Sequence, residues 1–357
     1  MASAWGQGGA VWAVANWLLG LEALGHQVTL VEPILQDDGN PAAVDSVVEQ
    51  AGAALRGIGV EAELVPVTAV ESAAGRNALK SADLVIDLSG VLGEAGLLNI
   101  NADLVLVDLD PGFTQCWARD GLLSLSAYDA HVTVGTRIGR PGCPVPTAGV
   151  EWITTVPPVW SAAWADVSAP TSGRWTTVAN WRSYGSPQLD GRRLGQKAHA
   201  VRSLIDLPEL TPVKVSVALD IHPEESDDLA ALTGHHWDLV DPAVAATPES
   251  FRRFIADSTG EIGIAKEGYV VARTGWISDR TMAYLAAGRP AVVAATGVPG
   301  DLFPADGILT FDDAAGAAAG IATIESDLAA HGRAARAWVA RHAEARRVCA
   351  TVLEAVR

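Results

Sequence analysis

Residues Arg273–Pro290 read RTGWISDRTMAYLAAGRP, and this stretch decides the fold of the chain. The run Gly260–Ala272, GEIGIAKEGYVVA, leads into it. Within that run, Glu261–Ala265 is a short apolar segment that is typical of a buried strand. A loop that holds Gly268 and Gly275 is expected to follow the strand.

A helix and a second strand are predicted next. Ser278 stands where a helix N-cap belongs, with Asp279 in the first turn. Residues Thr281–Ala287 are apolar and favour a helix, which Gly288 ends. Pro290 then opens the buried strand PAVVAA. The order strand, loop, helix, strand indicates an α/β domain.

The start of this helix is a candidate anion site. Backbone N–H groups in the first turn of a helix lack partners, and the helix dipole is positive there. A phosphate or diphosphate is the natural ligand of such a site. The alternative is an ordinary turn between strand and helix, of which every α/β protein has several.

The same run resembles the donor-binding half of GT-B glycosyltransferases. The closer similarity is to a bacterial glycosyltransferase-like group with the pattern G-W-x-S-D-R-x-x-x-Y-L-A-x-G-R-P, which begins here at Gly275. Three further pieces are similar to that group: GGAVW near the start, DLDPGFTQCW at 108–117 and TTVANW at 176–181. The resemblance spans nearly the whole chain. It implies an α/β protein of GT-B architecture, with two Rossmann-like domains facing each other across a cleft.

The resemblance also implies an activity. The chain would move a sugar from a nucleotide-diphosphate sugar, its co-substrate, to a small-molecule acceptor such as a natural product. Neither a separate cofactor nor a metal is expected. However, many retaining GT-B enzymes carry a ribose-binding Glu where this chain has Ala283, and the paired E-x7-E signature is absent. Two alternatives therefore stay open: a nucleotide-sugar epimerase of the same fold, and a non-catalytic binding or auxiliary protein.

Site residues follow from the resemblance, position by position. Donor phosphates would lie at the Ser278 helix start, with Lys266, Arg273 and Arg280 as counter-charges, because guanidinium groups make forked contacts to phosphate oxygens. The other positions implied on the donor side are Gly8, Gly9, Asn180, Trp181, Lys197, Asp241, Gly275, Trp276 and Asp279. The alternatives are a helix-packing turn for the two early glycines, solvated surface positions for the lysines and core packing for the tryptophans.

The segment Asp108-Leu109-Asp110 spells D-x-D, which binds a divalent metal in GT-A glycosyltransferases. Residues two apart share a face of a strand, so the two carboxylates could converge if the strand extends that far. Capping of the next helix, a catalytic or acceptor contact, and a metal site are the three interpretations. Because GT-B-like proteins usually manage without a metal, Asp110 is the candidate base or acceptor contact for an inverting reaction.

The N-terminal segment predicts a βαβ opening. A short strand at Met1–Trp5, a glycine loop at Gly6–Gly9, a helix over Ala10–Leu24 and a strand over Gln27–Glu32 follow one another. Glu32 would hold a ribose hydroxyl in a dinucleotide enzyme. The fingerprint G-x-G-x-x-G is not met, so a Rossmann oxidoreductase is not favoured.

Composition restricts the partners and the compartment. The chain has 357 residues, enough for two domains, and a formal net charge of −17, which argues against nucleic acid and anionic membrane surfaces. Its three cysteines are widely spaced, as expected in a reducing cytoplasm. No segment predicts membrane insertion, and a homodimer is compatible with the sequence. The predicted domains are 1–168 on the acceptor side, 169–335 on the donor side, and 336–357 as a helix crossing back to the first domain.

Overall fold

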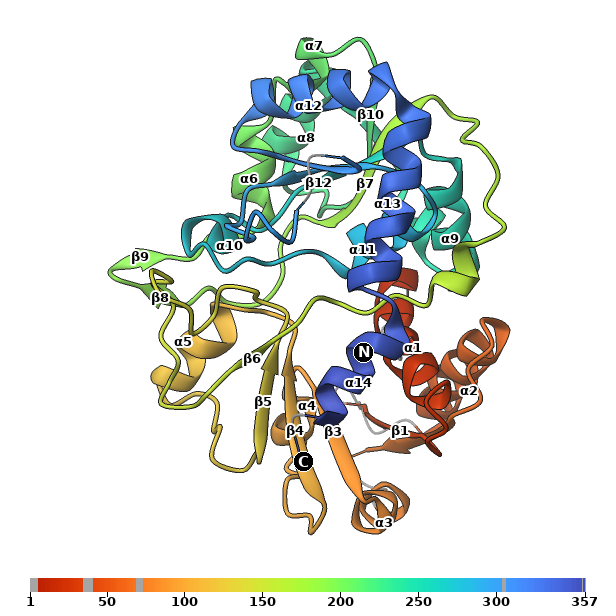
Figure 1. The fold of residues 1–357 in the computed structure, drawn as a ribbon, viewed down its shortest axis with the longest axis vertical. Coiled ribbons are helices and arrows are strands. Elements are labelled where there is room, and N and C mark those ends of the chain that lie inside the picture. Colours follow the sequence, from red (N-terminus) through yellow and green to blue (C-terminus); the bar gives the residue numbers. More distant parts are fainter. Residues whose placement is uncertain (1–5, 35–40, 69–72, 304–305, 355, 357) are drawn as a thin grey trace.

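The computed structural model describes residues 6–34, 41–68, 73–303, 306–354 and 356. These residues form two lobes, one above the other in Figure 1. The first part of the chain, coloured red to yellow, builds the lower lobe, and the green and blue parts build most of the upper lobe. Both lobes contain parallel β-sheet with helices packed on it, so the predicted α/β class is confirmed.

Parallel strands in two groups form the core of the lower lobe. The first group pairs β1 (Thr29–Pro33) with β2 (Glu63–Val67), and the second has the order β3-β4-β5-β6 (Leu84–Leu88, Asp103–Asp108, Ala130–Thr133, Ile153–Thr154). Its helices are α1 (Gly8–Glu22), α2 (Pro41–Gly57), α3 (Ala73–Ser81), α4 (Val91–Glu94) and α5 (Phe113–Arg119). The predicted strand at Met1–Trp5 lies outside the described residues.

The upper lobe is built on a six-stranded parallel sheet of order β11-β10-β7-β12-β13-β14. Its strands, in chain order, are β7 (Arg174–Asn180), β10 (Lys214–Asp220), β11 (Asp238–Val240), β12 (Gly260–Gly263), β13 (Ala291–Ala294) and β14 (Ile308–Phe311). The helices of this part are η1 (Ser161–Trp164), α6 (Lys197–Ser203), α7 (Leu207–Leu210), α8 (Ser226–Gly234), η2 (Pro242–Ala245), α9 (Pro248–Asp257), α10 (Glu267–Val271), α11 (Asp279–Ala286) and α12 (Ala314–Ser326). A short antiparallel hairpin, β8 (Gln188–Leu189) and β9 (Arg192–Arg193), projects beside α5 of the lower lobe.

The predicted strand–helix–strand unit is confirmed as β12, α11 and β13. Ser278 is the N-cap of α11, because its hydroxyl accepts a bond from the Arg280 amide at 3.2 Å. The chain turns out of the helix at Gly288, whose φ of +71° suits glycine. The expected loop around Gly268 is wrong. Gly268 lies inside α10, where an added Cβ would come within 2.9 Å of the Phe113 ring.

Main-chain groups join the two lobes. Gly135, just past β5, forms an antiparallel bridge with Trp276 of the upper lobe. The amide and hydroxyl of Thr136 both donate to the Gly275 carbonyl, at 3.3 and 2.8 Å, and the Arg137 amide donates to the neighbouring Thr274 carbonyl at 3.1 Å. Gly275 has a φ of +71°, and a Cβ there would lie 2.3 Å from the Thr136 hydroxyl oxygen. Glycine is therefore required at the joint.

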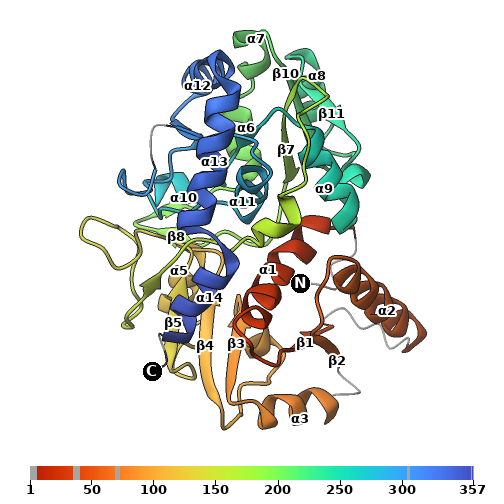
Figure 2. The same ribbon diagram turned by 45° about the vertical axis from the view of Figure 1, so that its right-hand side comes forward.

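The end of the chain touches both lobes. Helix α13 (Leu328–His342) packs on α11, and its Arg336 donates to the carbonyls of Ala286 and Ala287 at 2.8 Å. Helix α14 (Ala345–Glu354) packs on α1, with the Cys349 thiol 3.5 Å from the Trp17 carbonyl. Figure 2 shows α13 running along the upper lobe and α14 beside the lower one. None of the helices in the described ranges is long and apolar enough to cross a lipid bilayer.

Candidate functional site

A buried ion pair connects the lobes at the carboxyl edges of their sheets. Asp110 follows β4 of the lower lobe, and Lys266 is the N-cap residue of α10 in the upper lobe. The Lys266 ammonium lies 3.3 Å from one Asp110 oxygen and 3.2 Å from the other. The Tyr269 hydroxyl also donates to the Asp110 carboxylate, and Lys266 donates to the Tyr184 hydroxyl. One carboxylate of the lower lobe is thus held by donors from the upper lobe.

Asp108 fixes the turn that presents Asp110. It is fully buried and accepts bonds from Thr114 at 2.6 Å, and from Gln115 and Thr133 at 2.7 Å. It also accepts the Asp110 amide at 2.8 Å. Strand β4 ends at Asp108, so Asp110 lies beyond the strand. The two carboxylates of the D-x-D segment have separate side-chain partners. They do not form a joint metal site, and Asp110 alone faces the upper lobe.

Burial and charge act against each other at the pair. Burial raises the pKa of Asp110, while the nearby Lys266 charge and the Tyr269 hydroxyl oppose that rise. Burial lowers the pKa of Lys266, and Asp110 opposes that fall. Each partner thus offsets part of the effect of burial on the other. Removing either one leaves the other buried without compensation.

Aromatic rings surround the Lys266 ammonium. It lies 4.0 Å from the ring centre of Tyr184, 4.8 Å from that of Phe113 and 5.3 Å from that of Tyr269. Trp276 stacks on Tyr269 with centroids 4.5 Å apart. These faces attract a cation and shield it from water. They also present flat surfaces suited to an organic ligand.

The Arg280 guanidinium already has hydrogen-bond partners within the protein. Its Nε donates to Glu261 at 2.7 Å and its Nη1 to the Val178 carbonyl at 2.7 Å. Glu261 is fully buried in β12, so it needs this guanidinium as its counter-charge. Only Nη2 has no partner among the described residues. This nitrogen is itself buried, so it offers no exposed donor to a phosphate in this structure.

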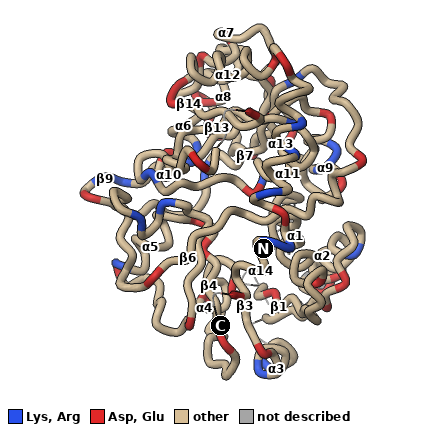
Figure 3. The backbone as a smooth tube through the Cα atoms, in the orientation of Figure 1, with Lys and Arg blue, Asp and Glu red and all other residues tan. Residues whose placement is uncertain are grey.

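Lys197 is a basic side chain without a partner among the described residues. It is the first residue of α6, and the described residues give it no hydrogen bond or ion pair. Burial lowers the pKa of Lys197 well below its usual value, and the charges of Arg280 and Lys266 lower it further. Three basic side chains, Lys197, Lys266 and Arg280, thus lie close enough in the upper lobe for their charges to interact. Figure 3 shows acidic residues distributed over both lobes.

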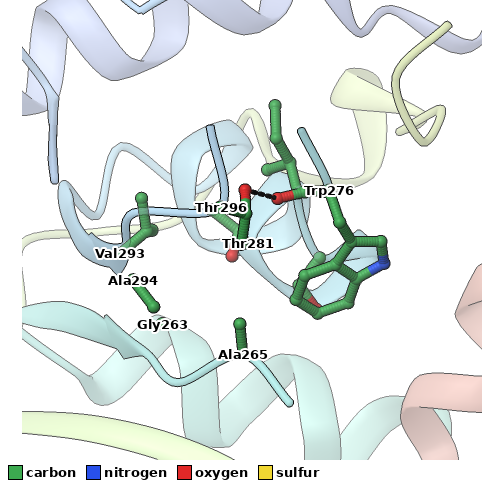
Figure 4. Close-up of a pocket in the computed structure, with 9 residues that line it drawn as sticks. Gly263, Ala265, Trp276, Thr281, Val293, Ala294 and Thr296 are labelled. Carbon is green, nitrogen blue, oxygen red and sulfur yellow. Dashed lines mark hydrogen bonds between the residues drawn. The ribbon is translucent and has the colours of Figure 1, made fainter. Parts of the chain in front are cut away.

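The start of α11 is partly occupied by its own side chains. The Arg280 amide donates to Asp279 at 2.8 Å as well as to Ser278. Figure 4 shows the pocket beside it, where the Thr296 hydroxyl donates to the Trp276 carbonyl at 2.6 Å. The volume of this pocket is about 10 Å³, room for about one water. An anion at this helix start would have to displace the Asp279 carboxylate from the first turn.

The two glycines at the start of α1 are packed closely. An added Cβ at Gly8 would lie 2.2 Å from the Thr247 carbonyl oxygen, and one at Gly9 would lie 3.1 Å from the Phe251 ring. Their positions therefore agree with the alternative of a packing turn. Their predicted contact with the donor stays a prediction.

The remaining predicted donor residues lie outside the ion-pair cluster. Trp181 is 2% exposed and packs in the upper core, with Arg202 5.6 Å from its ring centre. Asp241 caps η2 by accepting the Ala243 amide at 2.8 Å. Two others are exposed: Asn180 at the end of β7, and Arg273, which has a φ of +48°.

A cavity of about 810 Å³ lies beside the ion pair. Both lobes line it: Asp110 and Trp117 come from the lower lobe, and Tyr184, Trp276 and Asp279 from the upper one. Its size suits a small organic ligand. The structure thus brings Asp110, Lys266, Trp276 and Asp279 together, with Lys197, Ser278 and Arg280 nearby in the upper lobe.

Sequence analysis did not select two tyrosines that belong to this site. Tyr269 is three residues after Lys266, a spacing that places two side chains on one face of a helix. Recognising α10 as a helix would have revealed it. Tyr184 lies in a loop after β7, and no local pattern marks it.

Comparison with known proteins identifies the fold. No protein-family model matches the chain, and no curated protein matches its sequence significantly. Among solved structures, an alpha-glucosyltransferase (AGT) in complex with UDP has a TM-score of 0.63 at 13% identity, covering 99% of this chain and 97% of that one.

Two further structures agree with this match. HepE of Anabaena, in complex with UDP and glucose, has a TM-score of 0.58 at 14% identity, with 95% of each chain covered. AviGT4, a glycosyltransferase of avilamycin A biosynthesis, has a TM-score of 0.53 at 17% identity, covering 99% of this chain and 90% of that one. Together with the two parallel-sheet lobes, these matches show that the chain has the GT-B fold of glycosyltransferases, as the resemblance predicted.

Proposed function

We propose that this protein is a glycosyltransferase that moves a sugar from a nucleotide-diphosphate sugar to a small-molecule acceptor. The observation that carries the proposal is the meeting of Asp110 and Lys266, from opposite lobes, at a cavity of about 810 Å³. Lys197 lies near Lys266 and Arg280 and has no partner of its own among the described residues, so a diphosphate placed there would favour its charged form. A fold alone does not define an activity, so these residues are what supports the proposal.

The proposed reaction is a substitution at the anomeric carbon of the donor sugar. An acceptor hydroxyl oxygen attacks the anomeric carbon of the donor sugar, and a new C–O bond forms. The bond from that carbon to the diphosphate oxygen breaks, and its electron pair leaves with the diphosphate. If the reaction inverts the configuration, the Asp110 carboxylate accepts the hydroxyl proton. Lys266 and Lys197 then stabilise the charge that develops on the leaving group.

Lys266 has to change partner in this scheme. In the structure it is paired with Asp110, and a donor diphosphate would offer it a stronger anionic partner. Movement of the ammonium toward the phosphate would free Asp110 to act as a base. The protein's own cations supply the positive charge, and Asp108 is held by four hydrogen bonds, so a metal-independent reaction forms part of the proposal.

Thermal shift against UDP, dTDP, GDP and ADP, with NAD as control, tests the donor site. A ligand that binds only the folded state raises the melting temperature according to its concentration and affinity. UDP is the first choice because AGT and HepE are solved with it. Stabilisation by one diphosphate supports the proposal. Stabilisation by NAD alone would contradict it in favour of a dinucleotide enzyme.

Incubation with the matching nucleotide sugar then separates the activities. A transferase releases the nucleoside diphosphate when an acceptor is added, and does so slowly with water alone. An epimerase of the same fold would instead produce a new nucleotide sugar without any acceptor. Binding with neither product would indicate a non-catalytic protein.

A further inference from the structure

The large cavity between the lobes has a distinct chemical character. Its walls carry the rings of Trp17, Trp117, Tyr184 and Trp276 beside aliphatic side chains. The described residues expose three large hydrophobic side chains: Leu122 at 76%, Tyr184 at 47% and Leu210 at 50%. Both Leu122 and Tyr184 line this cavity. Exposed apolar side chains that gather at a cavity indicate a ligand with an apolar body.

The charges of this cavity have one sign. Its lining includes the carboxylates of Glu94, Asp110 and Asp279, and none of the described residues that line it is Lys, Arg or His. Lys266, just outside the lining, balances Asp110. Glu94 forms no ion pair with the described residues, whereas the charge of Asp279 interacts with those of Lys197 and Arg280, which lie outside the lining. The charged side chains of the wall itself are thus all carboxylates, and they disfavour an anionic group placed against that wall.

We propose that this cavity receives an acceptor with an aromatic or otherwise apolar core that is neutral or positively charged, and that it rejects an anionic acceptor of the same shape. The inference rests on the proposed glycosyl transfer, because Asp110 is the group that would meet the acceptor hydroxyl. It adds the chemical class of acceptor, which the fold does not define. Carboxylates on the wall act on the charge of the acceptor, and the rings act on its core.

Three phenols of nearly equal size test the charge rule. Tyrosol is neutral, tyramine is a cation and 4-hydroxyphenylacetate is an anion at pH 7, while all three share one 4-hydroxyphenyl group. Their binding is measured by calorimetry with and without UDP. We expect 4-hydroxyphenylacetate to bind at least about tenfold more weakly than tyrosol, and tyramine to bind as well as tyrosol or better.

Variants locate the effect. Glu94→Gln and Asp279→Asn each remove one carboxylate of the wall, so each should raise the affinity ratio of the anion to the neutral phenol about threefold or more. Asp120→Asn is the matched control, because Asp120 is exposed at the end of α5 and does not line the cavity. It should leave the ratio unchanged. An unchanged ratio in both cavity variants would overturn the assignment of charge selection to this wall.

The remaining outcomes are also decisive. Binding of the anion as tight as that of tyrosol overturns the inference, and so does failure of all three phenols to bind while UDP binds. UDP binding and slow donor hydrolysis are measured separately. If these two fail, the proposed function fails, whatever the phenols do; if they succeed while the charge rule fails, only this inference falls.

Discussion

Lys266 in the upper lobe places its ammonium 3.2 Å from a carboxylate oxygen of Asp110 in the lower lobe. The two side chains are only 14% and 15% exposed. The contact joins halves of the chain that fold around separate sheets. It places Asp110, the candidate base, next to Lys266, the candidate binding group for the diphosphate, before any substrate is bound.

Asp110→Asn should abolish the proton acceptor and keep the size of the side chain. Under the inverting form of the proposed function we expect sugar transfer to fall about 100- to 10,000-fold, the range for loss of a general base. Nucleotide binding should stay within a few fold. Steady-state transfer rates and UDP calorimetry measure the two effects, with Asp120→Asn as the control. Undiminished transfer by the Asp110→Asn variant would remove this carboxylate from the mechanism.

Lys197→Met and Lys266→Met keep most of the side-chain volume and remove the charge. Each should weaken UDP binding about tenfold or more, because hydrogen bonds to charged groups contribute about 1.5–3 kcal/mol. Lys80→Met, on the exposed surface of α3, is the matched control and should bind normally. Calorimetry at low and high salt tests the charge effect. If all three variants bind UDP as tightly as the native chain does, Lys197 and Lys266 do not bind the diphosphate.

Arg280→Met is expected to act on stability. It leaves the fully buried Glu261 without its counter-charge, and breaking a buried pair in this way costs about 3–5 kcal/mol. Adding Glu261→Gln should recover part of the loss, since the uncompensated charge is then gone. Denaturant unfolding of the single and double variants measures this. A double variant no more stable than Arg280→Met would show that the pair is not the cause.

Gly275→Ala should weaken the joint between the lobes. The positive φ costs about 1 kcal/mol or more for alanine, and the new Cβ would also meet the Thr136 hydroxyl at 2.3 Å. Gly173→Ala isolates the first cost, because Gly173 has a φ of +62° and open space around it. Unfolding experiments should therefore find Gly275→Ala clearly less stable than Gly173→Ala. Equal losses would mean that the joint adapts without cost.

Asp87 should make stability depend on pH. Burial raises the pKa of Asp87 from 3.8 to about 6, although Tyr128 and backbone amides oppose this rise. A folded state that holds the proton more tightly is most stabilised below pH 4, and this contribution is lost as pH rises to about 6. It amounts to about 3 kcal/mol at 1.36 kcal/mol per pKa unit.

Asp87→Asn removes this titration. The difference in unfolding free energy between the native chain and the variant should thus fall between pH 4 and 6 and stay level above that. Denaturant unfolding at a series of pH values measures the difference. A constant difference over this range would contradict the assigned pKa.

Local patterns predicted elements well where the chain obeys local rules. The apolar runs of β12 and β13, the hydroxyl of Ser278 and the turn at Gly288 all act within a few residues of the element that they define. Sequence alone could therefore place the strand–helix–strand unit. The similarity of the longer run to GT-B enzymes supplied the two-lobed architecture, which no local rule contains.

Contacts between distant segments limited the prediction of the site. Gly268 suggested a loop, but it is a helical position where the Phe113 ring leaves no room for a Cβ. Arg280 suggested a free cation, but packing of α11 against β12 gives it Glu261 as a partner. Tyr184 comes to Lys266 only when the two loops meet in the folded chain. Each of these relations depends on tertiary packing, which spacing along the sequence does not encode.

One contact between the lobes is made by peptide groups: Thr136 and Arg137 donate their amides to the carbonyls of Gly275 and Thr274. Every amino acid except proline brings the same peptide N–H and C=O groups, so most exchanges of side chain along these segments leave that bonding intact. Gly135 and Gly275 are the exceptions, since a Cβ at Gly135 would lie 2.5 Å from the side chain of Pro111. Descendants of this sequence could thus change most side chains of these two segments and still inherit this contact between their halves, provided that Gly135 and Gly275 remain glycine.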